Sequence, residues 1–336
     1  MPGEQRVHAR RPAVERYRWM MRAFVEFHLD FYRILSPRFC DDIEMVYLAQ
    51  ALTLRAGDLA FAPPTDMGEG GLAASAVSVS PLAQQLGLPR ETARRKLLRL
   101  TEEGVAIKVG LGEFALKPGV MAEPAYRETM VAVADLVQRY LNRCIVEDYI
   151  ALERRSTDGT VEILAPNADP PWQLALTDTE EALNALNLLF SQLFVHIYVV
   201  RGHLYEFDLQ QAMISDAVGL FSAEDLYHST SHRERLASIN VLLLENQKAA
   251  SMRWVVDQTG FPRETVRRKL KRLVDANYLA EVEDGRYIHK PGLFGRRDIV
   301  EAIQAVERLV VEFTEQTLLK GIFTVVRHES PAFSGF

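Results

Sequence analysis

Two twelve-residue segments of this chain carry a dense set of arginine side chains at almost the same spacing. Residues 89–100 read PRETARRKLLRL and residues 262–273 read PRETVRRKLKRL, so ten of the twelve positions are identical. A guanidinium group is planar, permanently charged and presents paired N–H donors, which match a phosphate or the O6 and N7 atoms of guanine. The chemistry open to these residues is recognition of anions or of base edges.

A helical period divides each segment into an apolar and a cationic face. The apolar face comprises Ala93, Leu97 and Leu100 in the first copy and Val266, Leu270 and Leu273 in the second. The polar face comprises Arg90, Glu91, Thr92, Arg94, Arg95 and Arg99 in the first copy, and Arg263, Glu264, Thr265, Arg267, Arg268, Lys271 and Arg272 in the second. We expect the polar side chains to contact DNA, with arginines on bases or phosphates and first-turn hydroxyls on phosphates.

The residues around each segment predict the elements that would position it. A short helix capped by Ser80 precedes the first segment, and Gly87 and Gly260 permit a tight turn before each basic helix. Two short β-runs around a glycine-containing turn follow each segment, at residues 104–117 and 278–290. Helix, turn, helix and hairpin in this order predict a winged helix-turn-helix.

The repeat continues beyond these segments, which indicates an internal duplication. Lys117–Pro118–Gly119 matches Lys290–Pro291–Gly292 at the same offset of 173. Upstream, the helical pattern of residues 43–56 is matched with that of residues 236–249. The predicted boundaries are a first repeat at 14–150 with its winged helix at about 43–118, a linker at 151–178 with a short strand at 161–164, and a second repeat at 179–330 with its winged helix at about 234–291.

Residues 86–104, LGLPRETARRKLLRLTEEG, resemble the recognition region of bacterial winged-helix repressors of the MarR, GntR and IclR kinds. The residue run is most similar to GntR heads, whereas the order of leading helices, central head and long trailing helix is more similar to MarR proteins. In MarR proteins the first and last helices form the dimer interface. The resemblance implies a fused pseudo-dimer whose apolar helices, at residues 24–35, 125–145, 182–200 and 299–319, pack together.

The predicted fold class is therefore mainly α with small β-hairpins (α+β), with two winged helix-turn-helix domains and a helical bundle related by a pseudo-two-fold axis. The composition is ordinary for a soluble globular protein, with 48% hydrophobic and 25% charged residues. The net charge of −6 requires that the positive charge be concentrated on the two helices. The apolar run at 182–200 is interrupted by polar residues, so we expect a buried helix and no membrane span.

Four further residues suggest an effector site where the leading helices of the two halves meet. His28 and Arg33 occupy similar places to His196 and Arg201, and ordinary packing is the alternative interpretation. His228 and His232 are four residues apart but lack further ligands, so no metal site is expected. The basic start of the chain, residues 6–11, could be a minor-groove arm or a segment without fixed structure. Cys40 and Cys144 lack the spacing of a disulfide or zinc motif.

Together these patterns predict a sequence-specific transcriptional regulator that responds to a small-molecule effector. It would be bacterial and cytoplasmic, bind a quasi-palindromic site in double-stranded DNA through two recognition helices, and need no cofactor. No catalytic motif is visible, so we expect no enzymatic activity. A replication-initiator-like DNA-binding protein and a non-catalytic winged-helix adaptor for other proteins remain the alternatives, and further association into a homodimer stays open.

Overall fold

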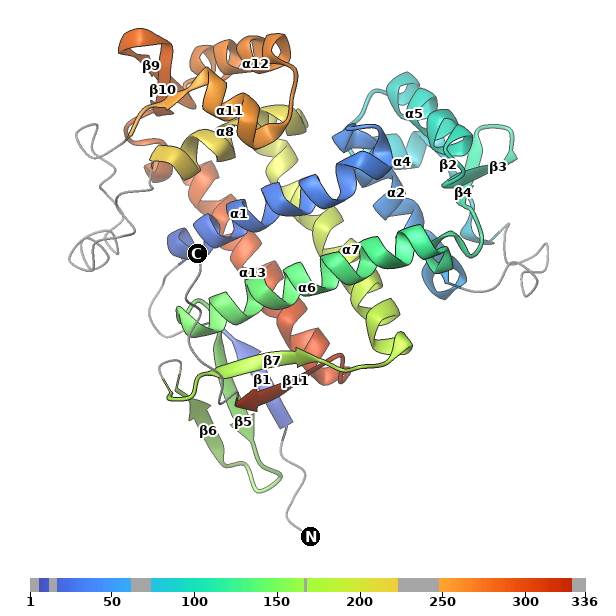
Figure 1. Cartoon of the computed structure of the whole chain (residues 1–336), viewed down its shortest axis with the longest axis vertical. Helices are drawn as coiled ribbons and strands as arrows, with labels where there is room; N and C mark the ends of the chain where they lie inside the picture. Colours follow the sequence, from blue (N-terminus) through green and yellow to red (C-terminus); the bar gives the residue numbers. More distant parts are fainter. Residues whose placement is uncertain (1–5, 12–16, 62–73, 166–167, 223–247, 328–336) are drawn as a thin grey trace.

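The computed structural model describes residues 6–11, 17–61, 74–165, 168–222 and 248–327. The chain is mainly helical and carries small antiparallel sheets, so the expected α+β class is confirmed. Figure 1 shows three regions: a central group of long helices, two small mixed regions at one end of it, and a set of strands at the opposite end.

Four long helices form the central bundle (Figure 1). They are α1 (Tyr17–Leu35), α6 (Pro124–Val146), α7 (Glu180–Gly202) and α13 (Arg297–Leu319). Helix α1 packs on α6 and α13, and α7 packs on α13 and α6, as the sequence predicted for these apolar helices. Aromatic rings join the two halves, since the Phe31 and Phe194 centroids lie 4.1 Å apart. The bundle is thus a shared core to which the other regions attach.

The N-terminal head, as we call residues 43–61 and 74–116, contains three helices and one small sheet. Its helices are α2 (Ile43–Ala56), α4 (Val79–Gln85) and α5 (Arg90–Glu102). Its sheet has the order β2–β4–β3, formed by Val77–Ser78, Glu113–Leu116 and Ala106–Gly110. Gly87 joins α4 to α5 with a φ of 57°, in the left-handed region that glycine adopts readily.

The C-terminal head, residues 209–222 and 248–289, has the same order of elements. Its helices are α8 (Leu209–Ser222), α11 (Met252–Thr259) and α12 (Arg263–Asp275). Its sheet has the order β8–β10–β9, formed by Ala250–Ser251, Arg286–His289 and Leu279–Val282. Gly260 makes the helix–helix turn with a φ of 69°. Short 3-10 turns complete the chain at Ser36–Phe39 (η1), Gly57–Ala60 (η2), Val120–Ala122 (η4), His203–Tyr205 (η5), Glu283–Gly285 (η7) and Leu293–Gly295 (η8).

The helix that corresponds to α2 is α8, so the predicted match between residues 43–56 and 236–249 is wrong. Two consecutive residues with positive φ precede both Asp42 and Asp208, and these two aspartates stand at the start of α2 and α8. This correspondence has an offset of 166, whereas the basic helices have an offset of 173. The register changes between the two helices because the intervening loops differ in length. Residues 236–247 lie outside the described part of the chain.

The segment 151–178 is not the linker that its composition suggested, because it forms three strands. They are β5 (Ala151–Arg155), β6 (Val161–Leu164) and β7 (Trp172–Leu176), of which β6 was predicted. Strand β5 pairs with β1 (Arg6–Arg10), and β7 pairs with β11 (Phe323–Arg327). Both partners come from the distant ends of the chain, so local periodicity gave no sign of the pairing.

The basic start of the chain is therefore part of the folded body and not a free arm. His8 Nδ1 lies 2.7 Å from Glu315 Oε1, and Arg11 Nη2 lies 2.6 Å from Glu307 Oε2, both on α13. These contacts hold β1 and the residue after it against the bundle. The minor-groove alternative for residues 6–11 is thus not supported by their position.

Helix α7 is the one described helix that is long and apolar enough to cross a membrane by composition, over Glu180–Tyr205. Half of its most apolar window is buried inside the protein, where it packs on α2 and α13. Ser191 on this helix is fully buried and hydrogen bonds to Gln50 of α2. These contacts are those of a core helix, which is consistent with a soluble protein.

Candidate nucleic-acid interface

The two basic helices are held in place by their apolar inner faces, as the sequence predicted. In α5 the side chains of Ala93, Leu97 and Leu100 are fully buried. In α12 the equivalent side chains Val266, Leu270 and Leu273 are also buried. Burial of one face fixes the rotation of each helix about its axis, so the opposite face must point outward.

A lysine, partly buried in α5 and buried in α12, adds a second anchor to each basic helix, which sequence reasoning missed. Lys96 forms ion pairs with Asp42 and Glu44 of α2, with Nζ 3.2 Å from the Glu44 carboxylate. Lys269 forms an ion pair with Asp208 at the start of α8. The signal was available in the repeat, because the same lysine stands among the inner leucines of both copies. These pairs fix each basic helix against the helix that opens its head.

The candidate contact residues stay at the surface. Their side chains form the outer faces of α5 and α12, which lie at the periphery of the two heads (Figure 1). In α5 the exposed residues are Arg90, Glu91, Arg94, Arg95 and Arg99. In α12 they are Arg263, Glu264, Arg267, Arg268, Lys271 and Arg272. Thr92 and Thr265 are half-buried. The protein therefore presents two cationic surfaces of nearly identical composition to solvent.

An arginine–glutamate pair has the same geometry on both helices. Arg94 donates from Nε and Nη2 to the two Glu91 oxygens, at 2.9 and 2.6 Å. Arg267 donates in the same way to Glu264, at 2.9 and 2.7 Å. These hydrogen bonds lower the pKa of both glutamates, which therefore stay ionised. The glutamate takes up the Nε edge of the guanidinium and leaves the Nη1 edge available for another acceptor.

Arg99 and Arg272 lie on the flank of their helices. Arg272 Nη1 is 3.9 Å from Asp208 Oδ2, although more than half of its side chain is exposed. Arg99 affects the pKa of Cys40, so it lies close to the loop before α2. Both arginines are therefore better placed to contact DNA phosphates beside the helix than to contact base edges.

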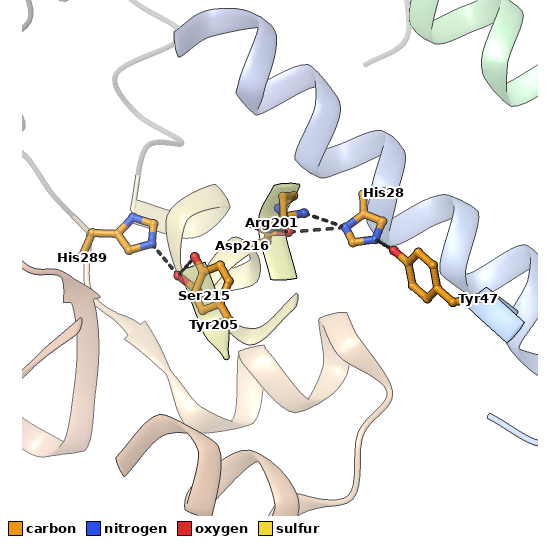
Figure 2. Close-up of polar contacts among 7 residues, drawn as sticks. All are labelled: His28, Tyr47, Arg201, Tyr205, Ser215, Asp216 and His289. Carbon is orange, nitrogen blue, oxygen red and sulfur yellow. Dashed lines mark hydrogen bonds and ion pairs between the residues drawn. The ribbon is translucent and has the colours of Figure 1, made fainter. Parts of the chain in front are cut away.

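Two of the four residues predicted at an effector seam are together, and two are elsewhere. Arg201 Nη1 lies 3.1 Å from His28 Nδ1 in the bundle interior (Figure 2). Arg33 is exposed and bonds to Asp30 and Gln258, and His196 is exposed. The predicted symmetry fails because His28 and His196 are not equivalent positions when α1 and α7 are aligned.

Asp216, which sequence reasoning missed, closes this seam. Arg201 Nη2 donates to both Asp216 oxygens at 2.6 and 2.7 Å, and all three side chains are buried. Burial opposes ionisation of Asp216, but Arg201 and His28 outweigh it and lower its pKa. Burial lowers the pKa of His28, so this imidazole is neutral at neutral pH; its Nδ1 also lies 3.4 Å from Asp216 Oδ2, and its Nε2 lies 3.4 Å from the Tyr47 hydroxyl. The side chains of this seam thus bond to one another in the protein interior.

The network continues into the C-terminal head. Tyr205 Oη lies 3.1 Å from Ser215 Oγ, which in turn lies 3.2 Å from His289 Nε2 on β10 (Figure 2). Burial lowers the pKa of His289 to about 4, so this imidazole is neutral at neutral pH. A polar chain thus links the bundle to the hairpin of that head.

A cavity lies between the bundle and the N-terminal head. It opens to solvent and is small, with a volume of about 30 Å³, which is the room that one water molecule occupies. Its lining is mostly apolar and aromatic, with Arg38, Gln50, Tyr126, Thr129 and Asn187 as polar members. Arg38 Nε donates to Thr129 Oγ1 at 3.3 Å, and its guanidinium lies 5.7 Å from the centre of the Tyr126 ring.

Within the described ranges no group of three side chains could hold a metal ion, and the His228 and His232 pair lies outside them. Comparison of the chain with protein-family models, with curated proteins and with solved structures finds no match in any of the three. The function must therefore be argued from the residues themselves.

Proposed function

We propose that this protein is a sequence-specific DNA-binding transcriptional regulator that carries two winged helix-turn-helix heads on one chain. The observation that carries the proposal is the pair of exposed cationic helices, α5 and α12. Each is held outward by a buried apolar face and an ion-paired lysine, and each presents the same arginine–glutamate pair. Such a helix, preceded by a tight turn and followed by a hairpin, has the arrangement that enters the major groove in winged helix-turn-helix proteins.

The arginine pair supplies a specific means of reading bases. With Glu91 on the Nε edge of Arg94, the remaining edge of the guanidinium can donate two hydrogen bonds to guanine O6 and N7. The glutamates can accept from the amino group of cytosine. Because α12 repeats this geometry, the protein would recognise two similar half-sites, arranged as a quasi-palindrome if the heads are related by a pseudo-two-fold axis.

Contacts between the halves support a fixed spacing of the two heads. Tyr198 of α7 donates to the backbone oxygen of Leu86 in the N-terminal head at 2.6 Å. In the opposite direction, Tyr32 of α1 packs on Phe261 in the C-terminal head, with centroids 5.7 Å apart. Each leading helix therefore touches the helix–helix turn of the other half. We expect half-sites about one helical turn, ~34 Å, apart, and sharply weaker binding when base pairs are inserted between them.

The duplicated element order, together with the resemblance to MarR and GntR regulators, favours a cytoplasmic bacterial regulator that responds to a ligand. Arg201 at the expected effector site is paired with Asp216, and the cavity beside Arg38 has a volume of only about 30 Å³, so an effector would bind beside Arg38 only if this cavity widens. This cavity adjoins both the bundle and α2, and a bound molecule there could shift the N-terminal head against the bundle.

The decisive test removes the two base-reading arginines. The Arg94→Ala and Arg267→Ala double variant should lose specific binding to duplexes selected from a random-sequence library, measured by fluorescence anisotropy. Its free energy of unfolding should stay within about 0.5 kcal/mol of the parent because both side chains are exposed. The matched control is Arg154→Ala with Arg327→Ala, which removes two charges at the opposite end of the bundle and should leave binding unchanged.

Salt dependence separates this proposal from the adaptor alternative. Phosphate contacts release counterions, so the affinity should fall steeply as the salt concentration rises. A wild-type protein that ignores DNA at low salt would overturn the proposal and favour an adaptor. Binding confined to repeated, direct-oriented sites would instead favour the replication-initiator alternative.

A further inference from the structure

The two hairpins beside the basic helices carry opposite charge at matched positions. We call residues 106–116 the N-terminal wing and residues 279–289 the C-terminal wing. Lys108 faces Phe114 across the first wing, and Glu281 faces Tyr287 across the second, at the same place in the repeat. An exposed cation in one head is thus an exposed anion in the other.

The tips of the wings differ as well. The N-terminal tip is Gly110–Leu111–Gly112 and is followed by the exposed Glu113, whereas the C-terminal tip is Glu283–Asp284–Gly285 and is followed by the exposed Arg286. The N-terminal wing thus has one lysine and one glutamate, and the C-terminal wing has three acidic residues and one arginine. The near-identity of the basic helices therefore does not extend to the hairpins that follow them.

Each wing lies close to the basic helix of its own head. Strand β3 packs on α5, and β9 packs on α12. In the C-terminal head, Tyr287 interacts electrostatically with Arg267, and its hydroxyl lies 3.5 Å from Glu281 Oε1. Glu281 therefore stands on the side of the wing that faces the outer arginines. A duplex bound to α12 would bring its phosphates toward this carboxylate, and one bound to α5 would bring them toward Lys108.

Leu111 is the most exposed large apolar side chain in the described part of the protein, with 99% of its surface in solvent. It stands between two glycines, and Gly112 has a φ of 72°, so the turn projects this side chain away from the head. Apolar side chains of this size serve as wedges in the minor groove of DNA. A leucine with no packing partner in the free protein fits that role.

We propose that only the N-terminal wing contacts DNA, with Lys108 on a phosphate and Leu111 in the minor groove beside its half-site. The carboxylates of Glu281 and Glu283 keep the C-terminal wing away from the phosphates. The two half-sites are then read by equivalent helices but differ in their flanks. This inference rests on the proposed DNA-binding function, and it adds that one flank of the site contributes to affinity and the other does not.

The test is a hydroxyl-radical footprint of the full chain on a duplex selected from a random-sequence library. We expect minor-groove protection beyond one half-site only. Lys108→Glu should remove this protection, weaken binding roughly tenfold and reduce the salt slope by about one phosphate contact. Glu281→Lys should instead strengthen binding and create protection beyond the other half-site. Lys320→Glu, the same charge reversal on an exposed lysine at the end of α13, should change neither quantity.

Leu111→Ser separates the wedge from the charge. It should lower the affinity several-fold and weaken the flanking protection, and the salt slope should stay unchanged because no ionic contact is lost. Equal protection of both flanks in the wild type, or a Lys108→Glu variant that binds like the wild type, would overturn the inference while leaving the proposed function intact. A wild-type protein that does not bind DNA at all would instead overturn the proposed function.

Discussion

The inner sides of the two heads, where each meets the bundle, use opposite kinds of side chain at equivalent positions. The N-terminal half has Leu35, Phe39, Gln50 and Leu116 where the C-terminal half has Arg201, Tyr205, Asp216 and His289. In the first set Leu35, Phe39 and Gln50 border the cavity and Leu116 is buried in the core. In the second set Arg201 pairs with Asp216, and Tyr205 and His289 both contact Ser215. One fold thus joins head to bundle in two ways, although the outer faces of the basic helices hardly differ.

This difference has a physical consequence for how firmly each head is oriented. An apolar contact is non-directional and tolerates small shifts, whereas a buried ion pair requires one geometry and is costly to break. We infer that the C-terminal head is held in one orientation by Arg201 and Asp216. The N-terminal head has no such ion pair at the equivalent positions, Leu35 and Gln50, so its orientation is fixed less strictly.

The largest expected effect comes from breaking the ion pair on one side only. Asp216→Ala leaves Arg201 charged and unpaired in the interior, so the free energy of unfolding should fall by about 3–5 kcal/mol. Gln50→Ala, at the equivalent position in the N-terminal half, removes a neutral hydrogen bond to Ser191 and should cost about 1–2 kcal/mol. Urea titration of both variants measures the two losses.

A double variant that copies the N-terminal residues into the C-terminal half tests the same difference between the two halves. Arg201→Leu with Asp216→Gln installs the N-terminal pair in the C-terminal half, and it should recover most of the stability lost in Asp216→Ala because no charge remains unpaired. If Asp216→Ala and Gln50→Ala cost the same, the two halves would be anchored equally and the inferred difference in firmness would be wrong.

The sequence predicted the parts of this comparison that depend on local periodicity. The long helices, the turns at Gly87 and Gly260 and the exposure of the arginines all follow from residue spacing within one segment. The network was missed because Asp216 lies in a helix that the repeat alignment placed elsewhere. The partner of this aspartate, Arg201, can be identified only from the way in which α7 and α8 pack together.

The second expected effect is a pH dependence that His289 contributes in the C-terminal head. The pKa of His289 is about 4 in the folded protein and about 6.5 when exposed in the unfolded chain. The unfolded state therefore binds more protons between these values, so the stability contributed by neutral His289 is present above pH 6.5 and is lost as the pH falls to 4, by about 3 kcal/mol. Leu116 holds the equivalent place in the N-terminal head and does not titrate.

His289→Leu, which copies the N-terminal head, isolates this contribution. The difference in unfolding free energy between parent and variant should change by about 3 kcal/mol from pH 6.5 to pH 4, in favour of the variant at low pH. Other acid-sensitive groups, His28 and Asp216 among them, are common to both proteins and cancel in the difference. A difference that is constant with pH would show that His289 does not titrate between these limits.

The pairing of β1 with β5 and of β7 with β11 could not be predicted from the sequence either. Alternating side chains at residues 151–155 are too few to distinguish a strand from a loop, and their partner Arg6–Arg10 lies at the far end of the chain. The same holds for contacts between the halves, such as Tyr198 with Leu86. Only the tertiary arrangement reveals them, and they set the spacing on which the proposed site depends.

The smallest effect concerns the two helix–helix turns, which look alike in sequence but differ in their surroundings. A Cβ atom at Gly87 would lie 2.2 Å from the ring of Phe207, a residue of the other half, whereas a Cβ at Gly260 would meet nothing within 4 Å. Both glycines have positive φ, so alanine costs about 1 kcal/mol at either position. Gly87→Ala should cost a further 1–3 kcal/mol, roughly, for displacing the ring.

A double-mutant cycle separates backbone strain from the contact between the halves. In a Phe207→Ala background the obstructing ring is gone, so Gly87→Ala should cost only about 1 kcal/mol, as Gly260→Ala does in the wild type. Urea titrations of the four proteins of the cycle and of Gly260→Ala provide the values. Equal costs for Gly87→Ala with and without Phe207 would mean that the ring does not press on this turn. The fixed spacing would then depend on the other contacts between the halves, among them Tyr198 with Leu86 and Tyr32 with Phe261.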